Sequence, residues 1–262
     1  MKKTFRYISY FFLILTVIIL TLPFIYVIKN GLSFIFTFPY PEEIKYAFKI
    51  SIMTAFISSF ICMIFTLMVC YSMENIPSKI KTIYEYIFSL PLGVPHIVSG
   101  IALISFFGQK GIGKFLLDNF NIDFVYTVSG IALAQFFVNL PYSIKTFNQS
   151  YEMINKKLLF SARTLGLNEP QVFFHVLMPM LKTQIFSMWM INISRALGEF
   201  GAVMMLVGVT RMKTETLATS IFLNMSTGDF DVACGVSIIL IMVSMITMFI
   251  FQRLMKKETK KC

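Results

Sequence analysis

Six apolar segments constrain the fold of this chain more than any other feature of its sequence. They cover residues 7–28, 47–71, 83–107, 124–147, 182–208 and 232–252. Each is close to the ~20 residues that an α-helix needs to cross the hydrocarbon core of a bilayer. A helix also satisfies its own backbone hydrogen bonds, which lipid cannot do. The pattern therefore predicts an all-α membrane protein with six transmembrane helices.

The composition agrees with a membrane protein and argues against several kinds of site. Hydrophobic residues make up 56% of the 262 residues, and the mean hydropathy of +0.74 is far above the range of soluble proteins. The four cysteines form no Cys-x-x-Cys pair, and His96 and His175 lie far apart in the sequence. We therefore expect no disulfide framework, no metal site, no catalytic residues and no cofactor in this chain.

The basic residues predict the orientation in the membrane. With the N-terminus placed inside, 15 of the 23 Lys and Arg residues fall on the inner side and 7 on the outer side, while Arg195 lies within a span. This bias follows the positive-inside rule, so we expect a multi-pass protein of the cytoplasmic membrane with both termini in the cytoplasm. The basic tail, residues 254–262, would lie near anionic headgroups. Topology explains the net charge of +10 without nucleic acid as a partner.

The longest polar interruption, residues 151–180, predicts a loop with structure of its own on the cytoplasmic side. Leu158, Ala162 and Leu165 fall on one side of a short first helix. Gly166 can end that helix, because glycine readily adopts the left-handed conformation of a C-terminal cap.

A second short helix is predicted directly after this glycine. Asn168 can cap its N-terminus, with Pro170 in its first turn and Pro179 at its end. Its apolar face would consist of Val172, Phe173 and Val176. The two helices form an elbow whose apolar surface suits another protein or the membrane surface.

The third apolar segment contains helix-breaking residues near its start, among them Pro91 and Pro95. Proline distorts a helix, and a membrane tolerates this where protein or a water-filled path satisfies the freed carbonyls. Two interpretations fit, a broken helix beside a pathway and a packing kink without substrate contact. We expect His96 to be a satisfied interfacial side chain and not a proton carrier.

The fifth apolar segment contains two charges, Arg195 and Glu199, four residues apart and hence on one face of a continuous helix. Ionisable residues inside a membrane are costly and mark function by default. Three roles compete: a structural ion pair, a gate latch and an arginine that attracts anions. The first two are favoured, because an arginine committed to a nearby carboxylate has little charge to offer a substrate.

The outer loop from Val209 to Asp231 contains several charges that suit the docking of a charged partner or a solvated loop. They are Arg211, Lys213, Glu215, Asp229 and Asp231.

Within the elbow, the sequence resembles the coupling loop of ATP-binding cassette (ABC) importer permeases. That pattern is Glu-Ala-Ala, three residues, Gly, nine residues, Ile, one residue, Leu-Pro. Ala162, Gly166 and Pro179 are in register with it. Phe160 stands at the acidic position and Ser161 replaces the first alanine. The stretches RALGEFGA, KTETL and STGDFDVA resemble the molybdate, tungstate and sulfate group in particular, and the first two of these anions more than the third.

The resemblance implies a type I ABC importer permease fold over residues 46–253, after an N-terminal helix and outer loop in residues 1–45. It implies an ATPase-coupling surface consisting of Ser161, Ala162, Arg163, Leu165, Gly166, Pro170, Val176 and Pro179. It also places the Pro-rich start of the third span beside the pathway. The candidates for pathway or gate are therefore Pro91, Pro95, Ser99, Arg195 and Glu199.

In function, the resemblance implies the permease subunit of an ATP-driven importer of molybdate or tungstate, with sulfate, thiosulfate or another small solute as the alternative. The expected partners are a second copy of the chain, a cytoplasmic subunit that binds ATP and Mg, an extracytoplasmic oxyanion-binding protein and the bilayer. An ion-coupled secondary transporter is a rival class. It would need paired acids or histidines in midmembrane and an inverted repeat, whereas Glu199 is the single acid placed near midmembrane and is already matched with Arg195.

Overall fold

The computed structural model describes residues 2–37 and 42–259, and over these ranges its regular secondary structure is entirely helical. The longer helices are α1 (Lys2–Thr37), α2 (Glu42–Ser72), α3 (Ser78–Gly93), α4 (His96–Phe107), α6 (Val128–Glu152), α10 (Lys182–Leu197), α12 (Leu217–Thr227) and α13 (Phe230–Thr259). The shorter ones are η1 (Met73–Asn75), α5 (Gly113–Phe120), α7 (Lys156–Thr164), α8 (Glu169–Gln171), η2 (Val172–Leu177), α9 (Met178–Met180) and α11 (Gly201–Val207). The predicted all-α class is confirmed.

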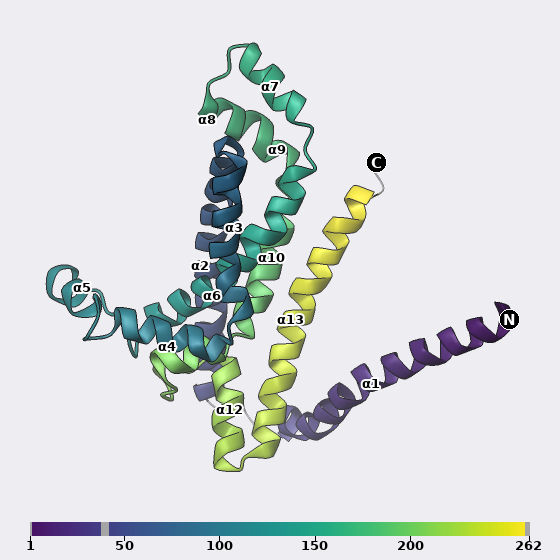
Figure 1. The fold of residues 1–262 in the computed structure, drawn as a ribbon. Helices are drawn as coiled ribbons and strands as arrows, with labels where there is room; N and C mark the ends of the chain where they lie inside the picture. The colour runs from purple at the N-terminus through teal and green to yellow at the C-terminus, as the bar shows by residue number, and fades with distance from the viewer. Residues whose placement is uncertain (1, 38–41, 260–262) are drawn as a thin grey trace.

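Four helices, α2, α6, α10 and α13, form the centre of the molecule (Figure 1). α2 runs along α6, and α10 packs against α2, α6 and α13. α7 and α8 project beyond one end of this bundle, and α12 lies at the other end (Figure 1). The elbow and the predicted outer loop are therefore separated by the length of the bundle.

Three helices are long and apolar enough to cross a membrane, over Phe5–Leu32, Glu42–Ser72 and Phe230–Arg253. The number rises to five if each of two bent pairs, α3 with α4 and α10 with α11, counts as one span. α6 has 25 residues and covers most of the predicted fourth span, but polar residues on its buried face lower its hydropathy. The multi-pass prediction is confirmed, and the count of six spans stays a prediction.

The buried face of α6 contains three polar side chains at helical spacing, Gln135, Asn139 and Ser143. The Gln135 amide N–H donates to the carbonyl of Ala196 in α10 at 2.9 Å, and Ser58 of α2 donates to the Gln135 carbonyl oxygen at 3.2 Å. Two turns further on, Ser143 donates to Asn192 of α10 at 2.8 Å. These contacts join α6 to both α2 and α10.

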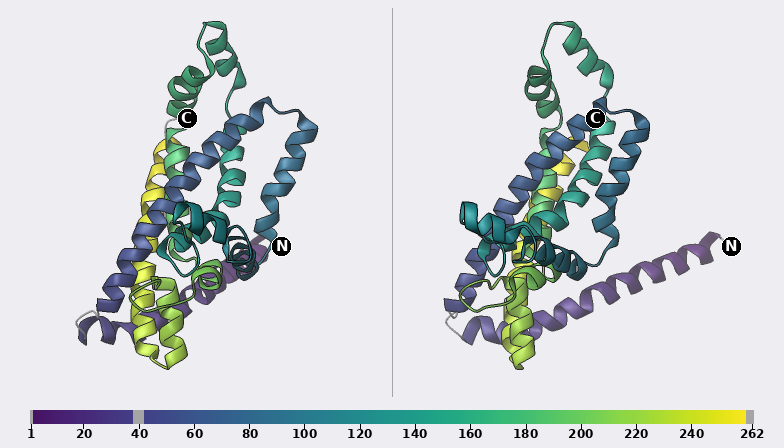
Figure 2. Two further views of the ribbon diagram at one scale, coloured as in Figure 1. Left: turned by 90° about the vertical axis from the view of Figure 1, so that its left-hand side faces the viewer. Right: turned by 60° about the vertical axis from the view of Figure 1, so that its left-hand side comes forward.

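α1 stands apart from the bundle for most of its length (Figure 2), and its side chains from Phe5 onward are largely exposed. It meets α13 near its end, where a Cβ atom on Gly31 would lie 2.7 Å from the backbone of Cys234. A Cβ atom on Gly235 would likewise lie 2.2 Å from the ring of Phe34. Glycines on both helices thus permit close approach of α1 and α13.

The predicted third span is two helices and not one. Val94 is extended (φ −100°, ψ 136°), and α3 and α4 meet at 108° around Val94 and Pro95. The interpretation as a broken helix is confirmed, because this angle far exceeds a packing kink. The fifth predicted span is broken as well, by 59° between α10 and α11. That these breaks border a pathway stays a prediction.

The two broken spans pack on each other at Gly100 of α4. A Cβ atom there would lie 2.8 and 2.9 Å from the carbonyl oxygen and Cα of Ala202 in α11. Gly100→Ala should therefore destabilise the protein by about 1–3 kcal/mol, because backbone must shift to admit the methyl group. Thermal unfolding of the purified chain in detergent measures this loss.

Gly93→Ala is the matched control, since a Cβ atom on Gly93 would meet nothing within 4 Å. Its effect should stay within about 0.5 kcal/mol. Equal melting temperatures for the two variants would contradict the proposed close packing of α4 on α11.

Candidate functional site

The elbow forms as two helical segments about a glycine. Gly166 follows α7 with φ +93°, the left-handed conformation that favours glycine. The Asn168 side chain accepts from the backbone N–H of Gln171, and the Gln171 side chain accepts from that of Asn168, a complete capping box with Pro170 in the first turn. The predicted roles of Gly166, Asn168 and Pro170 in the local structure are confirmed.

The predicted apolar face of α7 is wrong in its orientation. Leu159, 1% exposed, and Ala162 form the buried face, whereas Leu158 is half exposed and Leu165 is 81% exposed. The reason is that α7 packs on the following helix in one apolar cluster that includes Val172. Because of this packing, Leu158 and Leu165 face the solvent and not the interior of the elbow.

The second helix is also longer than predicted. Val172 and Phe173 are buried and Val176 is partly buried, as expected for its apolar face. Pro179 was predicted to end this helix, but η2 is a π-helical stretch that continues directly into α9, which contains Pro179. Pro179 has no N–H to donate within this continuous stretch, and the helix it follows is π-helical and not α-helical.

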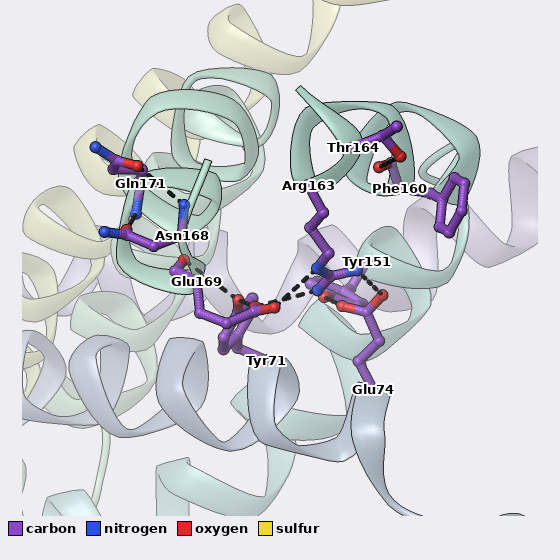
Figure 3. A network of polar contacts seen from close by, with 9 residues as sticks. All are labelled: Tyr71, Glu74, Tyr151, Phe160, Arg163, Thr164, Asn168, Glu169 and Gln171. Atoms are coloured by element: carbon purple, nitrogen blue, oxygen red, sulfur yellow. Dashed lines mark hydrogen bonds and ion pairs between the residues drawn. The ribbon is translucent and has the colours of Figure 1, made fainter. Parts of the chain in front are cut away.

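A polar network fastens the elbow to the ends of α2 and α6 (Figure 3). Arg163 of α7 donates two hydrogen bonds to the carboxylate of Glu169, at 2.9 and 3.2 Å. Its guanidinium also lies 3.8 Å from the carboxylate of Glu74 in η1. The Tyr71 hydroxyl of α2 donates to Glu169, and the Tyr151 hydroxyl of α6 donates to Glu74 at 2.5 Å.

The charges in this network stabilise one another. Hydrogen bonds from Arg163 hold the pKa of the Glu169 carboxyl below its usual range, and the same contact raises the pKa of Arg163. A lowered carboxyl pKa means that the contact contributes stability above the ordinary pKa of glutamate and loses it as the pH falls through the lowered value. The elbow is therefore fully fastened at neutral pH.

The eight predicted coupling residues differ in their accessibility. Ala162 is buried within the elbow, and Arg163 and Val176 are partly buried. The exposed ones are Ser161, Leu165, Gly166, Pro170 and Pro179. Phe160, where the family pattern has an acid, is 70% exposed. Leu158 and Leu165 are seven residues apart and form an exposed apolar surface on one side of α7 and its C-cap, which we call the α7 surface.

The predicted pair of Arg195 and Glu199 does not form, and each has another partner. Glu199, 5% exposed, contacts Nδ1 of His96 at 2.8 Å and accepts from the N–H of Ala202 at 3.0 Å. Arg195 donates through Nε to Asn139 at 3.2 Å. The physical reason is that α10 ends at Leu197, so the helical geometry assumed for a spacing of four does not hold.

The other pathway candidates lie along the broken third span. Pro91 is inside α3, Pro95 precedes α4, and Ser99 is buried in α4. His96, expected to be a satisfied interfacial side chain, has Glu199 as its partner and so links the two breaks. Its role was missed because its partner lies about one hundred residues away in the sequence.

The outer loop is less available for docking than its charges suggest. Glu215 is buried, as are its neighbours Thr214 and Thr216. Arg211 forms an ion pair with Glu43 at 3.2 Å. The interpretation of Glu215 as an exposed docking charge is therefore wrong, because residues 214–217 are buried and the Leu217 N–H donates to Ser51 of α2.

Apolar helices and two broken spans define this chain as a multi-pass membrane protein. Residues 67–261 match the family model of the binding-protein-dependent transport system inner membrane component, and the chain belongs to this family of ABC importer permeases.

Curated relatives include permease proteins of sulfate and molybdenum transport systems. The chain is 28% identical over 207 residues to the sulfate transport system permease protein CysT of Salmonella typhimurium, covering 79% of this chain and 75% of the relative. It is 29% identical over 205 residues to the molybdenum transport system permease protein ModB of Mycobacterium tuberculosis, covering 76% and 75%.

A solved structure has the same fold. It is a chain of the bacterial alginate ABC transporter in complex with alginate pentasaccharide-bound periplasmic protein. It matches with a TM-score of 0.74 at 17% identity and covers 99% of this chain and 98% of that one. The predicted permease fold is confirmed by this match.

Glu169→Gln should loosen the elbow without unfolding the bundle. The variant keeps a polar side chain but loses the charge that Arg163 contacts. Exposed ion pairs contribute about 0.2–1 kcal/mol, so amide hydrogen exchange over residues 163–169 should accelerate about two- to fivefold at neutral pH. The wild type should approach the variant as the pH falls through the lowered pKa of Glu169, after correction for the intrinsic exchange rate.

Glu42→Gln is the matched control, because it removes an exposed ion pair with Lys45 (2.8 Å) at the start of α2. It should leave exchange in the elbow unchanged. Wild-type exchange in the Glu169 variant would show that the network does not fasten the elbow.

Proposed function

We propose that this chain is the permease subunit of an ATP-driven importer that carries an oxyanion across the inner membrane. Membership of the permease family carries this proposal, and the sulfate and molybdenum relatives support the class of cargo. The importer complex contains three further components: a second copy of the chain, an extracytoplasmic oxyanion-binding protein and a cytoplasmic subunit. ATP and Mg bind to that cytoplasmic subunit, which hydrolyses the nucleotide.

In this proposal the elbow transmits the movement of the ATPase to the membrane helices. The α7 surface docks into the cytoplasmic subunit, and the Arg163 network joins the elbow to α2 and α6. ATP binding draws two such subunits together, so the elbows move and the bundle changes between inward-open and outward-open states. Different affinity of ATP for the two states supplies the bias.

Two cargoes are supported by specific observations. The motifs RALGEFGA, KTETL and STGDFDVA favour molybdate or tungstate, which we take as the first candidate. The CysT relatives favour sulfate as the second. All three are tetrahedral divalent oxyanions, so the choice among them rests on the outer binding protein as well as on this chain.

The decisive experiment measures ATP hydrolysis by the permease with its cytoplasmic subunit in lipid nanodiscs. A binding protein is added empty or loaded with molybdate, tungstate or sulfate. We expect stimulation by loaded protein, strongest with molybdate or tungstate. Stimulation by sulfate alone would select the second cargo, and a complex that responds to none of the three would overturn the oxyanion proposal.

Leu165→Glu tests the docking of the α7 surface. Because Leu165 is exposed and has no role in the core, the variant should fold normally but bind the ATPase subunit at least about tenfold more weakly, since a charge would be buried in an apolar interface. Pull-down of the subunit from detergent measures the loss.

Phe115→Glu in α5 is the control, with a 60% exposed apolar side chain far from the elbow. It should bind the ATPase subunit normally. Equal binding by both variants would exclude the α7 surface from docking.

A further inference from the structure

Arg195 has no carboxylate partner among the residues that the structure describes. It lies in the last turn of α10, about 20 Å along that helix from Lys182, well inside the bundle. Its guanidinium lies 4.2 Å from the ring centroid of Tyr142 and donates one hydrogen bond, from Nε to Asn139. The two terminal nitrogens of the guanidinium have no hydrogen-bond partner over the described ranges, so four N–H donors and a full positive charge remain available.

Asn139 provides a second and independent observation. It is 2% exposed, and its side-chain oxygen accepts from Arg195. This contact fixes which end of the amide is the oxygen. The amide nitrogen is then a buried donor beside the guanidinium, and it has no partner in the described part of the chain. Buried polar groups are nearly always paired, so an unpaired donor needs an explanation.

The neighbouring polar groups do not share this deficit. Gln135 and Ser143, one turn on either side of Asn139, are both hydrogen-bonded. Glu199 is held by His96 and by the N–H of Ala202, in the direction of α4 and α11. Other buried donors without a partner, among them the Trp189 ring nitrogen, are neutral. Only at Asn139 does such a donor lie beside a cation without a carboxylate partner in the described part of the chain.

We infer that Arg195 and Asn139 form a contact site for the oxyanion within the membrane part of the protein. This inference rests on the proposed function and names the residues that meet the cargo. A guanidinium presents parallel N–H donors that match two oxygens of a tetrahedral anion, and the Asn139 amide supplies a third donor. When the site is empty, the Tyr142 ring holds the cation through a cation–π contact.

A purely structural role for Arg195 makes the opposite prediction for one substitution. Asn139→Asp keeps the acceptor for the Arg195 Nε and adds a charge, so a structural contact would become stronger. For an anion site the same change is harmful, because the new carboxylate neutralises Arg195, repels the oxyanion and replaces the unpaired donor by an acceptor. Stability and transport should therefore change in different directions.

The experiment uses the full complex of permease, ATPase subunit and binding protein in proteoliposomes. The probe is radiolabelled molybdate, tungstate or sulfate, whichever stimulates the wild type. We expect uptake by Asn139→Asp to fall roughly tenfold or more, with a melting temperature of the assembled complex at or above that of the wild type. Uptake within twofold of the wild type by an intact complex would overturn the inference.

Gln135→Glu is the matched control for stability. It makes the same exchange of amide for acid one turn away, where the amide N–H is already used by the carbonyl of Ala196. The melting temperature of this variant should fall. Equal falls for the two variants would show that Asn139 does not pair with Arg195 as described, and would also overturn the inference.

A second pair of variants decides the question if Asn139→Asp does not assemble. Arg195→Lys keeps the charge and Arg195→Gln removes it, so the lysine variant should retain several-fold more uptake. Equal uptake by the two would overturn the inference while leaving the proposed function intact. A wild type that no loaded binding protein stimulates would instead overturn the proposed function, and the contact site with it.

Discussion

Buried hydrogen bonds between helices are the constraint on which this structure depends. Lipid is as apolar as a leucine side chain, so the hydrophobic effect does little to hold transmembrane helices together. Hydrogen bonds from the polar face of α6 hold the helices together instead. Gln135 bridges α2 and α10, and Ser143 donates to α10 two turns further on. A central helix that holds its two neighbours in this way fixes the positions of everything they carry.

The elbow depends on the same arrangement. α6 continues from its polar face to Tyr151 near its C-terminal end, and α2 ends in Tyr71 and η1, so both ends of the polar network belong to helices that are already joined. Apolar packing of Leu159 and Val172 makes the elbow one unit. A force applied to the α7 surface is therefore carried by two membrane helices and not by a flexible loop.

The sequence predicted those features whose signals are local. Gly166, Asn168 and Pro170 act on their own backbone, and Pro95 breaks the helix in which it stands, so each could be inferred without knowledge of the fold. Contacts between residues far apart in the sequence could not be predicted in this way. The pairing of Arg195 with Glu199 assumed a continuous helix. In the structure α10 ends at Leu197, although no proline near this position indicates a helix end. His96, Asn139 and the burial of Glu215 likewise follow from packing between distant segments.

The isolation of α1 has a consequence for the synthesis of the protein. Its close contacts are made with Cys234 and Gly235 in the last helix, whereas most of its length touches nothing else in the described chain. During translation α1 is made well before α13, its docking partner. While the rest of the bundle forms, α1 therefore lies in the bilayer without its docking partner. Its helical structure is then stabilised by its own backbone hydrogen bonds. Its final position is set only after α13 has been made, when the two glycines meet their partners.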